Sequence, residues 1–134
     1  MKIILILIIT GHYSYVNSQN NTEILIIPSK SVGNYILGEK LKHSYNEQEL
    51  EIKTQEGIIK EIIVKSSKYR TKDGFGVGTK FKKIKSRMGD TQKELKMSKD
   101  NVSIGKVVYG LFYKGIWFID TNKDNVVDGI WLVE

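Results

Sequence analysis

The chain has 134 residues, of which 40% are hydrophobic and 27% charged, and its formal net charge is +6 at pH 7. This length fits a single domain, and the composition is that of a soluble globular protein, so disorder throughout the chain is not expected. The chain has no cysteine, which excludes disulfide bonds and lipid attachment through an N-terminal cysteine. The fold must therefore rest on its apolar core.

The N-terminus carries a lysine followed by an unbroken apolar run from Ile3 to Ile9. This run is too short to cross a bilayer, which needs about 20 residues. Val16 and Ser18 occupy the −3 and −1 positions of a plausible cleavage site, so we expect residues 1–18 to be a secretory signal peptide. Residues 19–134 would then form a secreted or periplasmic domain without a membrane span. A buried N-terminal strand is the alternative, because isoleucine-rich runs also form central strands.

A strand and a hairpin are predicted in the first half of this domain. The apolar run from Ile24 to Ile27 ends at Pro28, which predicts a strand at a sheet edge. A short helix is expected after Gly38. Residues 50–53 and 58–64 flank a turn and predict a β-hairpin.

The best-defined element is a helix predicted over residues 79–88. Three glycines at alternate positions precede it, and the hydroxyl of Thr79 suits an N-cap. Its apolar residues recur at spacings of three and four, which places them on one face. Gly89 supplies the stop.

Strands dominate the rest of the chain. Residues 91–100 are polar and lysine-rich, so we expect an exposed loop there. Val107 to Tyr113 is apolar and aromatic, as in a strand. Residues 116–119 and 126–133 flank a turn rich in Asn and Asp, and they predict a second hairpin.

Two segments of the chain share one pattern. Gly38 and Gly78 each stand in the order apolar, glycine, polar, lysine, apolar. We therefore expect a tandem repeat of a turn–helix–hairpin unit, over residues 30–64 and 69–133. The two short helices would cover one face of an antiparallel sheet of hairpins, which predicts a single α+β domain.

Residues 69–78 read YRTKDGFGVG, and a helix ending in glycine, a GIWF segment at 115–118 and a V-x-x-I segment at 127–130 follow. This order resembles small extracytoplasmic proteins of bacteria with a Y-x-T-x-x-G-[IFV]-x-[VI]-G signature. Their architecture is similar to that of β-lactamase inhibitor proteins and of SmpA/OmlA-type outer-membrane assembly lipoproteins. The resemblance covers most of the domain and implies a secreted binding or structural module rather than a catalyst. The lipoprotein cysteine is missing from this chain.

The segment from Asp120 to Asp128 has two readings. Asp120, Asn122, Asp124 and Asp128 place oxygen atoms at alternate positions, as a calcium loop requires. A hairpin turn explains the same residues, because Asn and Asp side chains bond their own backbone. Trp131 stands where the bidentate glutamate of an EF-hand would be. A calcium site therefore remains an alternative, and no other cofactor is expected.

Basic and aromatic residues are the candidates for partner binding. Eight basic residues lie between Lys80 and Lys99, and they form either a site for an anionic partner or a solvated face. Aromatic residues either anchor interfaces or fill cores. The candidate residues are Tyr69, Arg70, Lys82, Lys83, Tyr109, Tyr113, Trp117 and Trp131.

Catalysis has little support in the sequence. His12 lies in the presumed signal peptide and His43 stands alone, so no histidine-based triad can be assembled. We expect a non-enzymatic module that recognises a protein or an envelope component through an exposed sheet face. Nucleic acid is not an expected partner, because no nucleic-acid-binding motif is present. A calcium-dependent surface module is the alternative.

Overall fold

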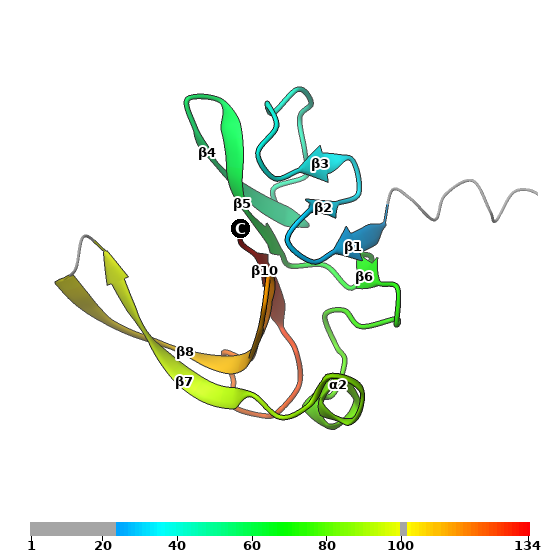
Figure 1. The fold of residues 1–134 in the computed structure, drawn as a ribbon, viewed down its shortest axis with the longest axis vertical. Helices are drawn as coiled ribbons and strands as arrows, with labels where there is room; N and C mark the ends of the chain where they lie inside the picture. Colours follow the sequence, from blue (N-terminus) through cyan, green and yellow to red (C-terminus); the bar gives the residue numbers. More distant parts are fainter. Residues whose placement is uncertain (1–23, 100–101) are drawn as a thin grey trace, which may run out of the picture.

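The computed structural model describes residues 24–99 and 102–134, so the predicted signal peptide lies outside the described residues. Over the described ranges the chain forms two β-sheets and one α-helix (Figure 1). The elements are β1 (Leu25–Ile27), β2 (Ser31–Val32), β3 (Tyr35–Ile36), β4 (Leu50–Gln55), β5 (Ile58–Val64), β6 (Arg70–Thr71), α2 (Phe81–Met88), β7 (Gln92–Lys99), β8 (Val102–Tyr113), β9 (Ile116–Ile119) and β10 (Gly129–Leu132).

The fold is mostly β, which contradicts the predicted α+β class with two helices over one sheet. Strands hold 47% of the described residues and helix 8%. The helix expected after Gly38 is absent from the described residues because the backbone there bonds to a hairpin instead. The Gly38 N–H donates to the Ile59 carbonyl at 2.8 Å, and the Leu41 N–H donates to the Gly57 carbonyl at 2.9 Å.

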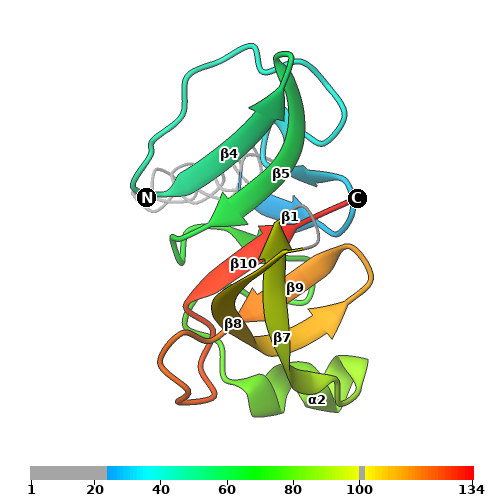
Figure 2. The ribbon, with the colours of Figure 1, turned by 90° about the vertical axis from the view of Figure 1, so that its left-hand side faces the viewer.

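The larger sheet has six strands in the order β4-β5-β10-β9-β8-β7, with every pair antiparallel. Both predicted hairpins are confirmed, as β4–β5 and β9–β10. The turn between β4 and β5 has positive φ at Glu56 (53°) and Gly57 (79°), as tight hairpins with a right-handed twist require. The last strand of the chain, β10, lies in the middle of the sheet between β5 and β9 (Figure 2).

The segment predicted as an exposed loop, residues 91–100, is instead mainly strand β7. It pairs with β8 along most of its length, from the Gln92–Leu111 pair to the Lys99–Val102 pair. β7 is an edge strand, and its charged residues protect an open edge from pairing with other chains. The polarity that suggested a loop is therefore the signature of an edge strand.

The smaller sheet has the order β3-β2-β1-β6 and lies against one face of the larger sheet (Figure 1). β1 was predicted at a sheet edge, but it lies between β2, to which it is antiparallel, and β6, to which it is parallel. The strand does end at Ile27, before Pro28.

The predicted helix over residues 79–88 is confirmed over Phe81–Met88, with Gly89 (φ 92°) as its C-cap. Its start differs from the prediction. Thr79 does not cap it, because the Thr79 hydroxyl accepts the Gly76 N–H at 2.9 Å. The N-cap is Lys80, which makes no side-chain cap bond.

The two segments with the shared sequence pattern use their backbones in the same way, although only one continues as a helix. The Gly38 N–H bonds to the Ile59 carbonyl at 2.8 Å, and the Gly78 N–H bonds to the Val127 carbonyl at 2.7 Å. Each segment also forms one antiparallel bridge to the residue before that carbonyl, namely Lys40–Ile58 and Lys80–Val126. The two segments therefore share a short antiparallel backbone pairing and not a turn–helix–hairpin unit.

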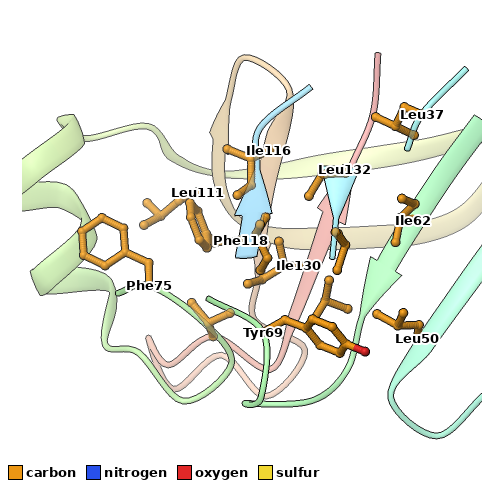
Figure 3. Close-up of a cluster of buried hydrophobic side chains, with 14 of the residues drawn as sticks. Leu37, Leu50, Ile62, Tyr69, Phe75, Leu111, Ile116, Phe118, Ile130 and Leu132 are labelled. Atoms are coloured by element: carbon orange, nitrogen blue, oxygen red, sulfur yellow. The ribbon is translucent and has the colours of Figure 1, made fainter. Parts of the chain in front are cut away.

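The core lies between the two sheets and the buried face of α2 (Figure 3). Phe118 on β9 is fully buried, and its ring centroid lies 6.3 Å from that of Phe75. α2 contributes Phe81 and Ile84, which are both buried. β4 shows the alternation of a strand with one face on this core, since Leu50 and Ile52 are buried whereas Glu51 and Lys53 are exposed.

Candidate recognition groove

The larger sheet turns a second face away from the core and the smaller sheet, and its own β7–β8 hairpin curls over part of this face (Figure 2). The alternation of β10 shows the division between the two faces. Ile130 and Leu132 are buried against the core, whereas Trp131 between them points to the opposite face and is half-buried. We call this opposite face the open face.

An aromatic row crosses the open face. Trp131 on β10 pairs with Trp117 on β9, and Trp117 pairs with Phe112 on β8. The two indole rings are stacked with their centroids 6.0 Å apart, and Phe112 meets Trp117 edge-on at 5.3 Å. Aromatic residues that face each other across neighbouring strands stabilise a sheet, so the row is also a rigid platform.

A groove of about 380 Å³ lies over the two tryptophans. One wall comes from β7, with Leu95 and Met97, and the other from Val133 after β10. Glu61 and Lys96 supply one charge of each sign. The groove thus combines an aromatic floor and apolar walls with a rim of mixed charge.

Small residues next to the aromatic row leave the open face uneven. Gly129 and Gly110 flank Ile119 in the adjacent cross-strand row. Gly110 is needed for a close backbone approach, because a Cβ there would overlap the carbonyl oxygen of Phe118. A second cavity of about 160 Å³ borders this row and also includes Trp131 in its lining.

The three tyrosines among the predicted binding residues lie on the core side. Tyr69 is 6% exposed, and its hydroxyl lies 3.4 Å from the Glu49 carboxylate. Burial raises the pKa of Tyr69, and the negative charge of Glu49 adds to this effect. Tyr109 packs against Phe81 with ring centroids 6.5 Å apart.

Tyr113 ties the sheet to the end of the helix. Its hydroxyl donates to the Gly89 carbonyl at 2.5 Å, and its ring meets Phe118 at 6.1 Å. Burial raises the pKa of Tyr113. None of the three tyrosines belongs to the groove lining.

The basic candidates lie elsewhere again. Arg70 on β6 is half-buried, and its Nη1 donates to the Gly74 carbonyl at 3.0 Å, so it braces the turn before α2. Lys82 and Lys83 are exposed on α2. Of the eight predicted residues, the structure brings only Trp117 and Trp131 together in the groove.

The three aspartates of the Asp120–Asp128 segment accept backbone N–H groups of their own turn. Asp120 is 1% exposed, and its two oxygens accept the N–H groups of Asn122 at 3.1 Å and Asn125 at 2.8 Å. Asp128 accepts the Thr121 N–H at 2.7 Å. Asp124 accepts the Val126 N–H at 3.0 Å. In residues 24–99 and 102–134 there is no group of three or more His, Cys, Asp or Glu side chains placed to hold a metal ion.

Sequence reasoning missed the walls of the groove. Leu95 and Met97 lie in the segment that the sequence predicts to be a loop, and Phe112, which extends the aromatic row beside the groove, is not among the predicted binding residues. The signal for Phe112 is its pairing with Trp117 across the Lys114–Gly115 turn, which period-two alternation predicts. No comparable signal marks the β7 residues, because lysines interrupt their apolar pattern.

In the described ranges, the helix has eight residues and is neither long nor apolar enough to span a membrane. Comparison with protein-family models, with curated proteins and with solved structures finds no match in any of the three. The resemblance to β-lactamase inhibitor proteins and SmpA/OmlA-type lipoproteins stays a prediction.

Proposed function

We propose that the chain is a secreted or periplasmic, non-enzymatic binding module that recognises a protein partner through the groove on its open face. The observation that carries the proposal is the stacked pair Trp117 and Trp131, half-buried on the open face and lining a groove of about 380 Å³. The apolar N-terminal run supports export, as the sequence predicts.

The chemistry of the groove favours a polypeptide as the occupant. Tryptophan and methionine are enriched at protein interfaces, and Trp117, Trp131 and Met97 all line the groove. The rim carries Glu61 and Lys96, so it matches a segment with charges of both signs around an apolar anchor. A uniformly charged polymer, such as nucleic acid or an acidic polysaccharide, would meet one like charge at this rim.

The experiment compares capture by three versions of the tagged protein from envelope extracts. They are the wild type, Trp131→Ala, and the double variant Lys82→Glu/Lys83→Glu as a surface control on α2. We expect a protein that is retained by the wild type and the lysine variant and is lost with Trp131→Ala. Hot-spot tryptophans typically contribute 2 kcal/mol or more, which corresponds to at least about a 30-fold loss of affinity.

The captured protein is then purified and titrated into the wild type. Both tryptophans of the chain line the groove, so a shift of their fluorescence emission reports occupation of the groove directly. The proposal is overturned if Trp131→Ala binds as well as the wild type, if only the lysine variant loses binding, or if titration leaves the emission unchanged.

A further inference from the structure

A second cavity, of about 360 Å³, lies on the other side of the molecule from the groove, beside β1 and the end of α2. Its inner wall is formed by Phe75, Ile116 and Phe118, which are all buried. Its outer lining includes Ile27 and Met88, which are 37% and 39% exposed. The cavity therefore connects the apolar core with solvent through an apolar mouth.

The charges around this mouth are mostly positive. Lys72 lines the cavity, and Arg87 on α2 lies within 3.6 Å of Asp73, which is also part of the lining. Two cations, Lys72 and Arg87, thus stand beside one acid, and that acid is already paired with Arg87.

The cavity selects against several kinds of ligand. Its lining is almost entirely apolar, so the hydroxyl groups of a sugar would lose hydrogen bonds to water without replacement. A cationic ligand would meet the positive charge of Lys72 in the lining. A volume of about 360 Å³ is in the range of small-molecule sites, which are mostly apolar with a few polar groups at defined positions.

We propose that this cavity binds a single-chain anionic amphiphile, with an alkyl chain against Phe75 and Phe118 and an acidic head group at Lys72. The head group would lie at the mouth, where Arg87, beside Asp73, adds positive charge. This ligand uses both properties of the site, the apolar interior and the basic rim. The proposal is independent of the groove, which lies on the opposite face of the larger sheet.

Chain length gives the first test, with octanoate and decanoate as probes below their micelle-forming concentrations. Each methylene group that leaves water contributes about 0.8 kcal/mol, or about a fourfold gain in affinity. We expect decanoate to bind about 15-fold more tightly than octanoate in calorimetry on the full chain. In NMR spectra the methyl signal of Met88 should shift, whereas that of Met97, in the groove, should stay in place.

Substitutions test the site itself. Ile27→Trp should fill the mouth and weaken decanoate binding at least tenfold, and Val107→Trp, at another exposed apolar position, should not. Lys72→Glu should weaken binding about fivefold to tenfold, whereas Lys60→Glu, at an exposed site on β5, should not. Circular dichroism verifies that each variant is folded. The Met88 methyl shift in the wild type decides the matter if Ile27→Trp does not fold.

Two further experiments test the charge of the head group and whether the ligand is a free amphiphile or part of a membrane. Decyltrimethylammonium should bind at least tenfold more weakly than decanoate, because its charge is opposite. Vesicles of anionic phospholipid should not retain the protein, since the cavity accepts a free chain rather than a membrane surface. Equal binding of the two decyl compounds, a shift at Met97 instead of Met88, or binding to vesicles alone would overturn the proposal.

Discussion

Replacing Asp120 by alanine tests whether this carboxylate organises the turn between β9 and β10. The side chain is 1% exposed and accepts two backbone N–H groups, from Asn122 and Asn125. A hydrogen bond to a charged group contributes about 1.5–3 kcal/mol. Asn122 and Asn125 are exposed, so water can replace part of the loss, and we expect a decrease of about 3 kcal/mol in the free energy of unfolding.

For a domain of this size, 1 kcal/mol corresponds to about 4 °C in melting temperature, so Asp120→Ala should melt about 12 °C below the wild type. The assay is thermal unfolding followed by circular dichroism. Asp124→Ala is the matched control in the same turn. Its carboxylate is exposed and accepts one N–H, so the loss should be about 0.5–1 kcal/mol.

Calcium addition completes this experiment. A carboxylate that is occupied by backbone N–H groups gains little from a metal ion, so millimolar calcium should leave the wild-type melting temperature unchanged. The turn interpretation fails if Asp120→Ala melts within 2 °C of the wild type. A clear rise of the wild-type melting temperature with calcium would restore the metal site at Asp120, Asn122, Asp124 and Asp128.

Four further predictions test the fold and the groove. Gly110→Ala should lower the free energy of unfolding in urea by about 2–3 kcal/mol, because the added Cβ would overlap the Phe118 carbonyl oxygen. Gly57→Ala should lower it by only about 1 kcal/mol, because Gly57 has a positive φ of 79° but open space around it. Phe118→Ala should lose about 3–5 kcal/mol in the same assay, and a loss below 1 kcal/mol would contradict its place in the core. Trp117→Phe and Trp131→Phe should each abolish the far-ultraviolet circular dichroism couplet of two stacked indoles, and a couplet that survives either change would refute the stacking. Burial and Glu49 raise the pKa of Tyr69 above 10.0 and favour its neutral form. Its contribution to stability should therefore be full below about pH 10 and fall at higher pH. From about pH 8 to 11, the free energy of unfolding should decrease less steeply for Tyr69→Phe than for the wild type.

Local patterns in the sequence predicted the hairpins and the helix but not the way they assemble. Glu56 and Gly57 mark a tight turn between alternating strands, and Gly89 ends α2, because these signals act within a few residues of the chain. The start of α2 was wrong because Thr79 is engaged by Gly76. That contact depends on how the glycine turn is held against Val127, which sequence spacing does not show.

The groove was accessible to sequence reasoning only in part. Trp117 and Trp131 were named, but so were Tyr69, Tyr109 and Tyr113, which lie on the core side. Composition treats these aromatic residues alike, and strand register separates them. A residue moves to the other face of a sheet when the pairing shifts by one position, so the face is known only when the partner strand is known. The wall from β7 has another cause, because lysines interrupt its apolar pattern and the sequence predicts a loop there.

The position of β10 has a consequence for the order in which the chain can fold. Val64 pairs with Ile130, so the two hairpins join only when segments far apart in the sequence come together. Closing such a long loop is slow, and an incomplete chain would leave the apolar side of β5 without its neighbour. Each hairpin can form from contacts that are local in the sequence, so we expect the pairing of β5 with β10 to limit the rate of folding.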